Sequence, residues 1–220
     1  MKIGILGTGS VGQTLGTALI SKEHHVMLGS RTATNEKAKA WTDKNGQYAL
    51  QGTFQDAASF GDILLISLNG SAAIEVLQQL TPASVKNKVI IDLTNPLDFS
   101  QGMPPSILPK YSNRFSLGED IQNTLPESHI VKGLNTVTAN LMVNAHLVNN
   151  GNHNLFICGN NVDAKIAVKH FLADNFNWKP EYVLDMGDIK AARLTEAIVP
   201  FWVGVMQVER SAMFNYLIVK

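Results

Sequence analysis

The sequence predicts a doubly wound α/β fold with a mostly parallel sheet. Short apolar runs alternate with amphipathic helical stretches along most of the chain, as in βαβ units. Most of the apolar runs are solid rather than alternating, which is typical of strands covered on both faces. A glycine-rich loop also joins the first apolar run to the first helical stretch. Together these observations favour an open sheet with helices on both sides.

Each expected element has its own short segment of the sequence. The strands are expected at 2–6, 26–28, 63–68, 89–93, 130–134, 155–157 and 182–184, with a weaker one near 48–50. The helices are expected at 11–22, 36–44, 72–80 and 162–175.

Two regions interrupt this alternation. Residues 96–128 are rich in Pro, Ser, Gly and Asn, and they predict a long loop with one short helix at 118–125. Residues 190–213 predict a long helix that Pro200 kinks or divides. We therefore expect a dinucleotide-binding domain over 1–188 and a short helical extension over 189–220, packed on that domain or on a dimer partner.

Composition narrows the class of protein. Of the 220 residues 45% are hydrophobic, enough for a substantial core, and the formal net charge is zero. This balance gives no reason to expect nucleic acid or a membrane surface as a partner. Cys158 is the single cysteine, so a cytoplasmic protein with a small buried thiol is expected. The uncharged stretch 3–20 holds five glycines, which argues against a signal peptide or a membrane span.

The loop Gly7-Thr8-Gly9-Ser10-Val11-Gly12 has the spacing of a dinucleotide-binding fingerprint. It follows the first strand and opens the first helix, which is the context that the motif requires. Gly7 permits the tight turn, Gly9 lets the backbone approach the pyrophosphate, and Gly12 lets helix and strand pack closely. The helix N-terminus offers free N–H groups to the phosphates. The sequence therefore predicts a Rossmann-type site.

The end of the second strand predicts which dinucleotide binds there. A site for NAD places Asp or Glu at this point, but no acid occurs from His24 to Asn35. Ser30, Arg31 and Thr32 follow the strand instead, and Lys37 lies one turn beyond. The guanidinium suits a 2′-phosphate, and the missing carboxylate removes repulsion. NADP(H) is the expected cofactor.

Short segments with polar residues follow three further strands. The candidate residues in them are Leu68 with Asn69, Asn95 with Pro96, and Asn135. Because ligands of doubly wound sheets lie at the carboxyl ends of the strands, these residues are candidates for the nicotinamide side. Ordinary turn chemistry, in which Asn is favoured, is the alternative interpretation.

Five segments in the same order resemble one family of proteins. They are the opening 2–9, Gly29-Ser30-Arg31, Thr94-Asn95-Pro96, the stretch 131–137, and 185–189 followed by Ala192-Arg193. Together they resemble the NADP oxidoreductases that act on a deazaflavin coenzyme of the F420 type. The N-terminal domain of pyrroline-5-carboxylate reductases is a more distant resemblance.

The resemblance implies hydride transfer between NADPH and a flat tricyclic deazaflavin or flavin-like acceptor. It implies that Thr8, Ser30 and Arg31 hold the adenosine phosphate end, with Asn95 and Asn135 near the nicotinamide. The segment 67–70 and the stretch 97–117 depart from the family pattern and are candidates for shaping the acceptor pocket.

No catalytic residue stands out. The six histidines are not spaced as metal ligands, and Tyr216-x-x-x-Lys220 lies too late in the chain for the tyrosine–lysine pair of short-chain dehydrogenases. The absence favours a mechanism of positioning, in which two rings are aligned. Reduction of a small imine or carbonyl, and a non-catalytic NADP-sensing module, are the alternatives. The apolar stretch from Phe201 to Val208 predicts core or subunit interface, and hence a homodimer.

Overall fold

The computed structural model describes residues 1–112 and 114–219. In this part of the chain, six parallel strands form the central sheet in the order β3-β2-β1-β4-β5-β8. Their bounds are β1 Lys2–Leu6, β2 His25–Ser30, β3 Ala49–Thr53, β4 Ile63–Ile66, β5 Val89–Asp92 and β8 His129–Lys132. Strands β2 and β3 follow β1 toward one edge of the sheet, whereas β5 and β8 follow β4 toward the other edge. The ligand crevice of such a sheet lies where the direction reverses, at the carboxyl ends of β1 and β4.

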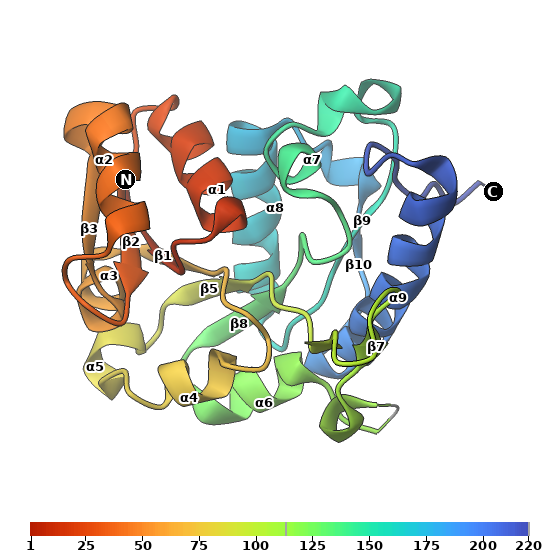
Figure 1. Ribbon diagram of the computed structural model, residues 1–220, viewed down its shortest axis with the longest axis horizontal. Coiled ribbons are helices and arrows are strands. Elements are labelled where there is room, and N and C mark those ends of the chain that lie inside the picture. The colour runs from red at the N-terminus through yellow and green to blue at the C-terminus, as the bar shows by residue number, and fades with distance from the viewer. Residues whose placement is uncertain (113, 220) are drawn as a thin grey trace.

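Helices cover both faces of this sheet (Figure 1). One face carries α1 (Ser10–Ile20), α2 (Glu36–Asn45), α7 (Ala139–Val143) and α8 (Val162–Phe176). The other carries α3 (Phe54–Phe60), α4 (Ala73–Leu77), α5 (Pro82–Val85) and α6 (Leu117–Thr124). The predicted doubly wound fold is confirmed.

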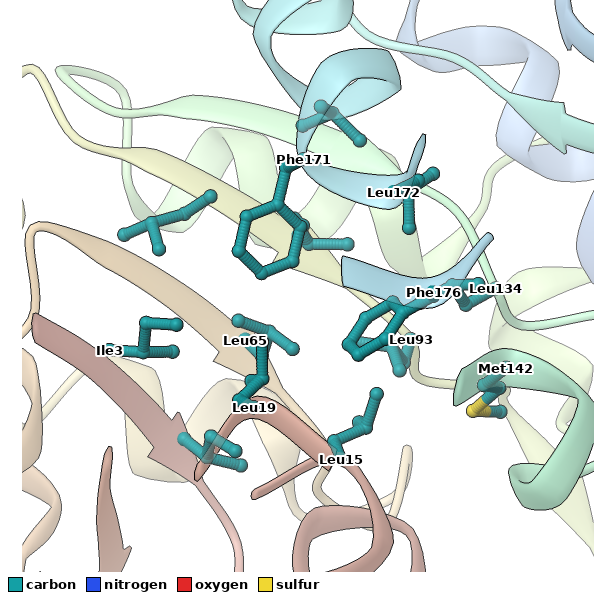
Figure 2. Close-up of a cluster of buried hydrophobic side chains, with 14 of the residues drawn as sticks. Ile3, Leu15, Leu19, Leu65, Leu93, Leu134, Met142, Phe171, Leu172 and Phe176 are labelled. Atoms are coloured by element: carbon teal, nitrogen blue, oxygen red, sulfur yellow. The ribbon is translucent and has the colours of Figure 1, made fainter. Parts of the chain in front are cut away.

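The alternation of side chains along each strand supplies both cores. In β4, Ile63 and Leu65 belong to the α1–α8 core, whereas Leu64 and Ile66 belong to the core on the opposite face. Figure 2 shows Leu65 between Leu19 of α1 and Phe171 of α8. Strands buried on both faces must be apolar throughout, which explains the solid hydrophobic runs.

Four of the described strands lie outside the central sheet, and two of them pair beside the end of β8. β9 (Leu155–Ile157) and β10 (Val183–Asp185) pair with each other in parallel. A single antiparallel bridge between Lys132 and Cys158 connects β9 to the end of β8. The Cys158 thiol is buried there, and burial raises its pKa to about 12. It is a protonated, unreactive side chain at neutral pH, as the sequence predicted.

The expected loop 96–128 holds more structure than predicted. It contains the short hairpin β6 (Leu97–Asp98) and β7 (Ser106–Ile107) before α6, which matches the expected helix. Ser116 begins α6 with a capping box, since its hydroxyl accepts from the Glu119 backbone and the Glu119 carboxylate accepts from the Ser116 backbone.

The last helix is shorter than expected. α9 (Ala192–Glu209) follows a 3₁₀ turn at Ile189–Ala191 and ends where Arg210 adopts a left-handed conformation, with φ of 52°. Residues 211–219 are therefore not helical, contrary to the predicted helix 190–213. Pro200 lies inside α9 without dividing it. Val199 and Val203 are buried on the inner side of the helix, and this packing stabilises α9 in spite of the proline.

The described residues contain neither a membrane-spanning helix nor a cluster of metal-binding side chains. None of their helices is long and apolar enough to cross a membrane. Nor do three or more His, Cys, Asp or Glu side chains gather among them as a metal site would require.

Candidate active site

The glycine loop lies between β1 and α1, as predicted. Gly7 has φ of +128°, and a Cβ on it would lie 2.6 Å from the Ser67 carbonyl oxygen. Gly12 is buried in α1, and its Cβ would lie 2.6 Å from the carbonyl oxygen of Gly7. Both glycines are required by the fold itself, the first by its backbone conformation and both by close packing.

Gly9 is different, because a Cβ on it would meet no atom within 4 Å. Its φ of −75° and ψ of 179° suit any residue at an N-cap. The fold therefore leaves open space at this position, directly in front of the free N–H groups of α1. The space leaves room for a phosphate group, as a dinucleotide-binding loop requires.

Replacement of Gly9 by alanine tests this interpretation. We expect the melting temperature to stay close to that of the wild type, whereas the dissociation constant for NADPH rises about tenfold or more, because the methyl group occupies the pyrophosphate's place. Calorimetry and fluorescence titration measure the two quantities. Gly12→Ala is the matched control, for which a loss of stability is expected. Unchanged NADPH binding by Gly9→Ala would contradict the assignment.

A cavity of about 330 Å³ adjoins the loop, and we call it the loop cavity. Its lining comes from the glycine loop, the end of β2 and the segment after β4: Gly7, Thr8, Gly9, Gly29, Ser30, Arg31, Asn35, Phe54, Ser67, Leu68, Asn69, Ala72 and Val76. The structure thus brings together seven of the predicted residues, Gly7, Thr8, Gly9, Ser30, Arg31, Leu68 and Asn69.

The turn after β2 is arranged for an anion. Ser30 is the last residue of β2, and its hydroxyl donates to the Thr32 carbonyl at 2.6 Å. This bond fixes a tight turn that leaves the Arg31 side chain exposed beside the cavity. Within the cavity lining Arg31 is the single charged side chain. No carboxylate competes there for a phosphate.

Besides Gly12, which is buried in α1 and lines neither this cavity nor the one beneath α9, three predicted residues lie elsewhere. Lys37, in the first turn of α2, lines a separate hollow between α1 and α2. Thr32 is exposed in the turn and lies outside the lining of the loop cavity. Pro96 is buried, and its carbonyl accepts from the Leu108 backbone, so it anchors the hairpin. Their contacts with a cofactor stay predictions.

A second cavity of about 390 Å³ continues the crevice beneath α9, and we call it the α9 cavity. It is lined by Ser10, Val11, Ser67, Leu68, Leu93, Asn95, Leu97, Asn135, Thr136, Val137, Thr138, Ala139, Met142, Val199, Trp202 and Val203. Ser67 and Leu68 line both cavities, so the two meet at the end of β4. The predicted Ser10, Val11, Asn95 and Asn135 lie in this second cavity.

Two asparagines at the strand ends hold each other in place. The Asn95 amide donates to the Asn135 carbonyl at 2.8 Å, and the Asn135 amide donates to Asn95 Oδ1 at 2.9 Å. Asn135 also donates to the Thr195 carbonyl at 3.0 Å. Because both partners of its NH₂ group are acceptors, the orientation of the Asn135 amide is fixed. Its Oδ1 atom is left buried without a partner.

Beneath these residues lies a buried ion cluster of Asp92, Lys132 and Glu196. The Lys132 ammonium contacts the Asp92 carboxylate at 3.0 Å and the Glu196 carboxylate at 2.9 Å, and none of the three side chains is more than 2% exposed. Burial alone would lower the pKa of Lys132, but the two carboxylates outweigh it and raise that pKa. The two carboxylates thus stabilise the charged form of Lys132.

The ion cluster joins three elements that are distant in sequence. Asp92 ends β5 and Lys132 ends β8, at paired positions of the sheet register. Glu196 comes from α9 and accepts from the backbone N–H groups of Leu117 and Gly118, each at 2.9 Å, at the start of α6. The cluster thus fixes α9, and with it one wall of the α9 cavity, to the carboxyl edge of the sheet.

A second ion pair reinforces this arrangement. The Arg193 guanidinium forms a two-pronged contact with the Glu119 carboxylate. Burial opposes ionisation of Glu119, but Arg193 and Ser116 together lower its pKa. Two charged residues on successive turns of α9, Arg193 and Glu196, therefore connect this helix to α6.

Sequence reasoning missed the ion cluster and the contribution of α9. The sequence does not indicate which side of its strand Lys132 faces, and the apolar stretch that contains Trp202 predicts only core or subunit interface. A usable signal was present: Asp92 and Lys132 each end a buried apolar strand, and such charges require partners. No comparable signal marks the lining residues of α9.

The α9 cavity restricts the chemistry. Among the described residues that line it, none has a titratable side chain. The cavity offers hydroxyl, amide and indole groups, which can orient a ring but do not exchange protons readily near neutral pH. Together with the glycine loop, this crevice has the design of a dinucleotide-dependent oxidoreductase, in which the protein positions the reacting rings.

Comparisons with known proteins specify the family. Residues 2–96 match the family described as NADP oxidoreductase, coenzyme F420-dependent. A crystal structure from Arthrobacter sp. FB24, provisionally described as an F420-dependent NADP-reductase, is 35% identical with a TM-score of 0.91, and the match covers all of both chains. The chain belongs to this family, and it is an NADP-dependent oxidoreductase with a Rossmann fold.

Two curated relatives extend the comparison. The F420-dependent NADP reductase of Methanocaldococcus jannaschii is 29% identical over 215 residues, which cover 93% of this chain and 92% of the relative. Metalloreductase STEAP3 of Rattus norvegicus is 28% identical over 209 residues, which cover 91% of this chain but 38% of the relative.

Proposed function

We propose that this protein transfers a hydride between NADPH and a deazaflavin of the F420 type, or a closely similar flavin. The observation that carries the proposal is the α9 cavity, whose described lining has no titratable group. Reduction of a carbonyl or imine requires a positioned proton donor, whereas a deazaflavin disperses the added charge over its own rings. The family's description and the relatives' names support the same acceptor.

The chain's own residues would act by binding and alignment. We propose that the α1 N-terminus and the space at Gly9 hold the pyrophosphate, and that Ser30 and Arg31 bind the 2′-phosphate. NADPH supplies the hydride when bound. Asn95 and Asn135, whose side chains are held by their mutual hydrogen bonds, would bind the nicotinamide side and help to align it with the acceptor.

Turnover with defined acceptors tests the proposal. NADPH oxidation is followed with deazaflavin, FMN, riboflavin or no acceptor, and NADH replaces NADPH as the cofactor control. Rapid NADPH oxidation with the deazaflavin is the expected result. Binding of NADPH without turnover on any acceptor would reject the proposal and favour the NADP-sensing alternative. Turnover confined to a small imine or carbonyl would favour the other enzyme class.

We further propose that 1–188 form the dinucleotide-binding domain and 189–220 an extension that completes it. Val199, Trp202 and Val203 of α9 support this, because they line the α9 cavity. Lys220 lies outside the described residues. The buried, protonated Cys158 thiol is compatible with the reducing cytoplasm as the location of the protein.

A homodimer is proposed from the outer face of α9. Leu194, Phe201 and Val208 are 62%, 62% and 80% exposed, and they are spaced seven residues apart. This spacing places them in one apolar stripe along the helix. A second copy of the chain, presenting the same stripe, would cover it.

We expect light scattering at micromolar concentration to give a dimer for the wild type and a monomer for Leu194→Lys, since the lysine would place a charge inside the interface. Leu147→Lys is the matched control, because Leu147 is likewise an exposed leucine, with 52% of its surface accessible, but lies outside α9. A wild-type monomer, or equal dissociation by the two variants, would contradict the proposal.

A further inference from the structure

The three tryptophans of this chain differ in one respect. The Trp41 indole N–H donates to the Thr17 hydroxyl and that of Trp178 to the Met142 carbonyl, each at 3.0 Å. The Trp202 Nε1 atom is buried and has no partner among the residues that the structure describes. Its residue lines the α9 cavity. A buried indole N–H without a partner is costly, and a ligand in the cavity would satisfy it.

Two more polar atoms of the same cavity share this property. Asn135 Oδ1 and Thr136 Oγ1 are buried without partners, and both residues line the cavity. The Asn135 oxygen can only accept, because its NH₂ group is engaged by Asn95 and Thr195. The Trp202 N–H can only donate. The residues around the cavity therefore hold one donor, one acceptor and one hydroxyl that serves as either, each buried without a partner among the described residues.

We infer that these atoms recognise an amide edge, in which a carbonyl oxygen lies next to an N–H group. The carbonyl accepts from Trp202, and the N–H donates to Asn135. This inference rests on the proposed function, which offers two sources of such an edge. One is the carboxamide of the nicotinamide, and the other is the pyrimidine-dione ring of the deazaflavin. A hydrocarbon would leave both the donor and the acceptor unsatisfied, and a metal ion would leave the Trp202 N–H without a partner.

The C-terminal segment 211–219 positions Trp202 for this task. The Phe214 ring stacks on Trp202 with centroids 5.2 Å apart and planes inclined by 20°. The Asn215 amide donates to His153 Nδ1 at 2.7 Å and to the Asn154 carbonyl at 2.8 Å. The Asn154 backbone N–H donates to the Tyr216 carbonyl. These hydrogen bonds connect the segment to the residues before β9, so that Phe214 is kept against one face of the Trp202 indole. In Figure 1 the C-terminus lies beside α9.

Trp202→Phe is the decisive variant, because it keeps an aromatic ring for Phe214 and removes the N–H. Three probes are titrated by fluorescence or calorimetry: NADP⁺, its 3-acetylpyridine analogue, which keeps the carbonyl but lacks the NH₂ group, and 5-deazariboflavin. We expect the variant to weaken one amide-bearing ligand about three- to tenfold, the effect of one neutral hydrogen bond. Trp41→Phe is the control, since its N–H bonds inside the protein.

Each arm of the experiment has a distinct meaning. Weaker NADP⁺ binding with unchanged deazaflavin binding assigns the edge to the carboxamide, and the wild type should then bind the acetylpyridine analogue less tightly than NADP⁺. Weaker deazaflavin binding, or a raised KM for it at unchanged kcat, assigns the edge to the acceptor. Unchanged affinity for all three probes would overturn the inference. Absence of turnover in the wild type rejects the proposed function instead, and the binding arms remain decisive.

Phe214→Ala tests the positioning role. We expect it to weaken the same ligand that Trp202→Phe weakens, because the unsupported indole no longer directs its N–H into the cavity. Met213→Ala, at the neighbouring exposed position, is the matched control. A fall in kcat alone, with unchanged binding of every probe, would contradict a role of Phe214 in ligand recognition.

Discussion

Replacement of Lys132 by methionine is expected to lower the free energy of unfolding by about 3–5 kcal/mol, the cost of leaving buried charges without their partner. The methionine fills a similar volume, but the carboxylates of Asp92 and Glu196 then face each other with no cation between them. Urea denaturation followed by circular dichroism measures the change.

An exposed ion pair provides the control. Lys86 contacts Glu127 at 2.7 Å, but both side chains are more than half exposed, so Lys86→Met should change stability far less. The triple variant Asp92→Asn, Lys132→Met and Glu196→Gln should be more stable than Lys132→Met alone, because no buried charge remains. An unfolding midpoint of Lys132→Met equal to that of the wild type would show that the ion cluster does not hold α9 in place.

The second large effect is expected at Arg31. Arg31→Ala should raise the dissociation constant for NADPH about 10- to 100-fold while leaving that for NADH unchanged, since charge-assisted bonds to a phosphate are lost and NADH lacks that phosphate. Arg31→Lys should be intermediate, because it keeps the charge but not the planar fork. Fluorescence titration with both dinucleotides measures the preference.

Lys37→Ala separates the two cations predicted for this end of the site. Lys37 lines the hollow between α1 and α2 rather than the loop cavity, so its replacement should matter less than that of Arg31. Equal loss of affinity for NADPH and NADH in Arg31→Ala would show that Arg31 does not read the 2′-phosphate.

The sequence was most informative where local chemistry determines the structure. The position of the glycine loop between β1 and α1 was predicted, because its glycines meet requirements of positive φ and close packing that leave a local mark. The roles of its residues, and of those after β2, in cofactor binding stay predictions. The strands of the central sheet were also predicted, because burial on both faces requires solid apolar runs. The short helices α3, α5 and α7 were not, since four to seven residues hold too little periodicity to be detected.

The other half of the crevice depends on contacts across the chain. Trp202 reaches the α9 cavity because Glu196, six residues earlier, meets Lys132 of β8 and the start of α6. Pairings of residues 64, 78 and 79 positions apart leave no local pattern. For the same reason the end of α9 was overestimated: the predicted helix ran to residue 213, but the segment after Arg210 instead forms tertiary contacts with Asn154 and Trp202.

The two cavities also differ in how much of the chain must fold before each exists. Every lining residue of the loop cavity lies between positions 7 and 76, whereas the α9 cavity needs residues from 10 to 203. Closing long chain loops is slow, and domains form their local contacts first. A ligand that occupies both cavities would therefore connect the first third of the chain with α9, and its binding would stabilise the folded chain over the whole distance between them.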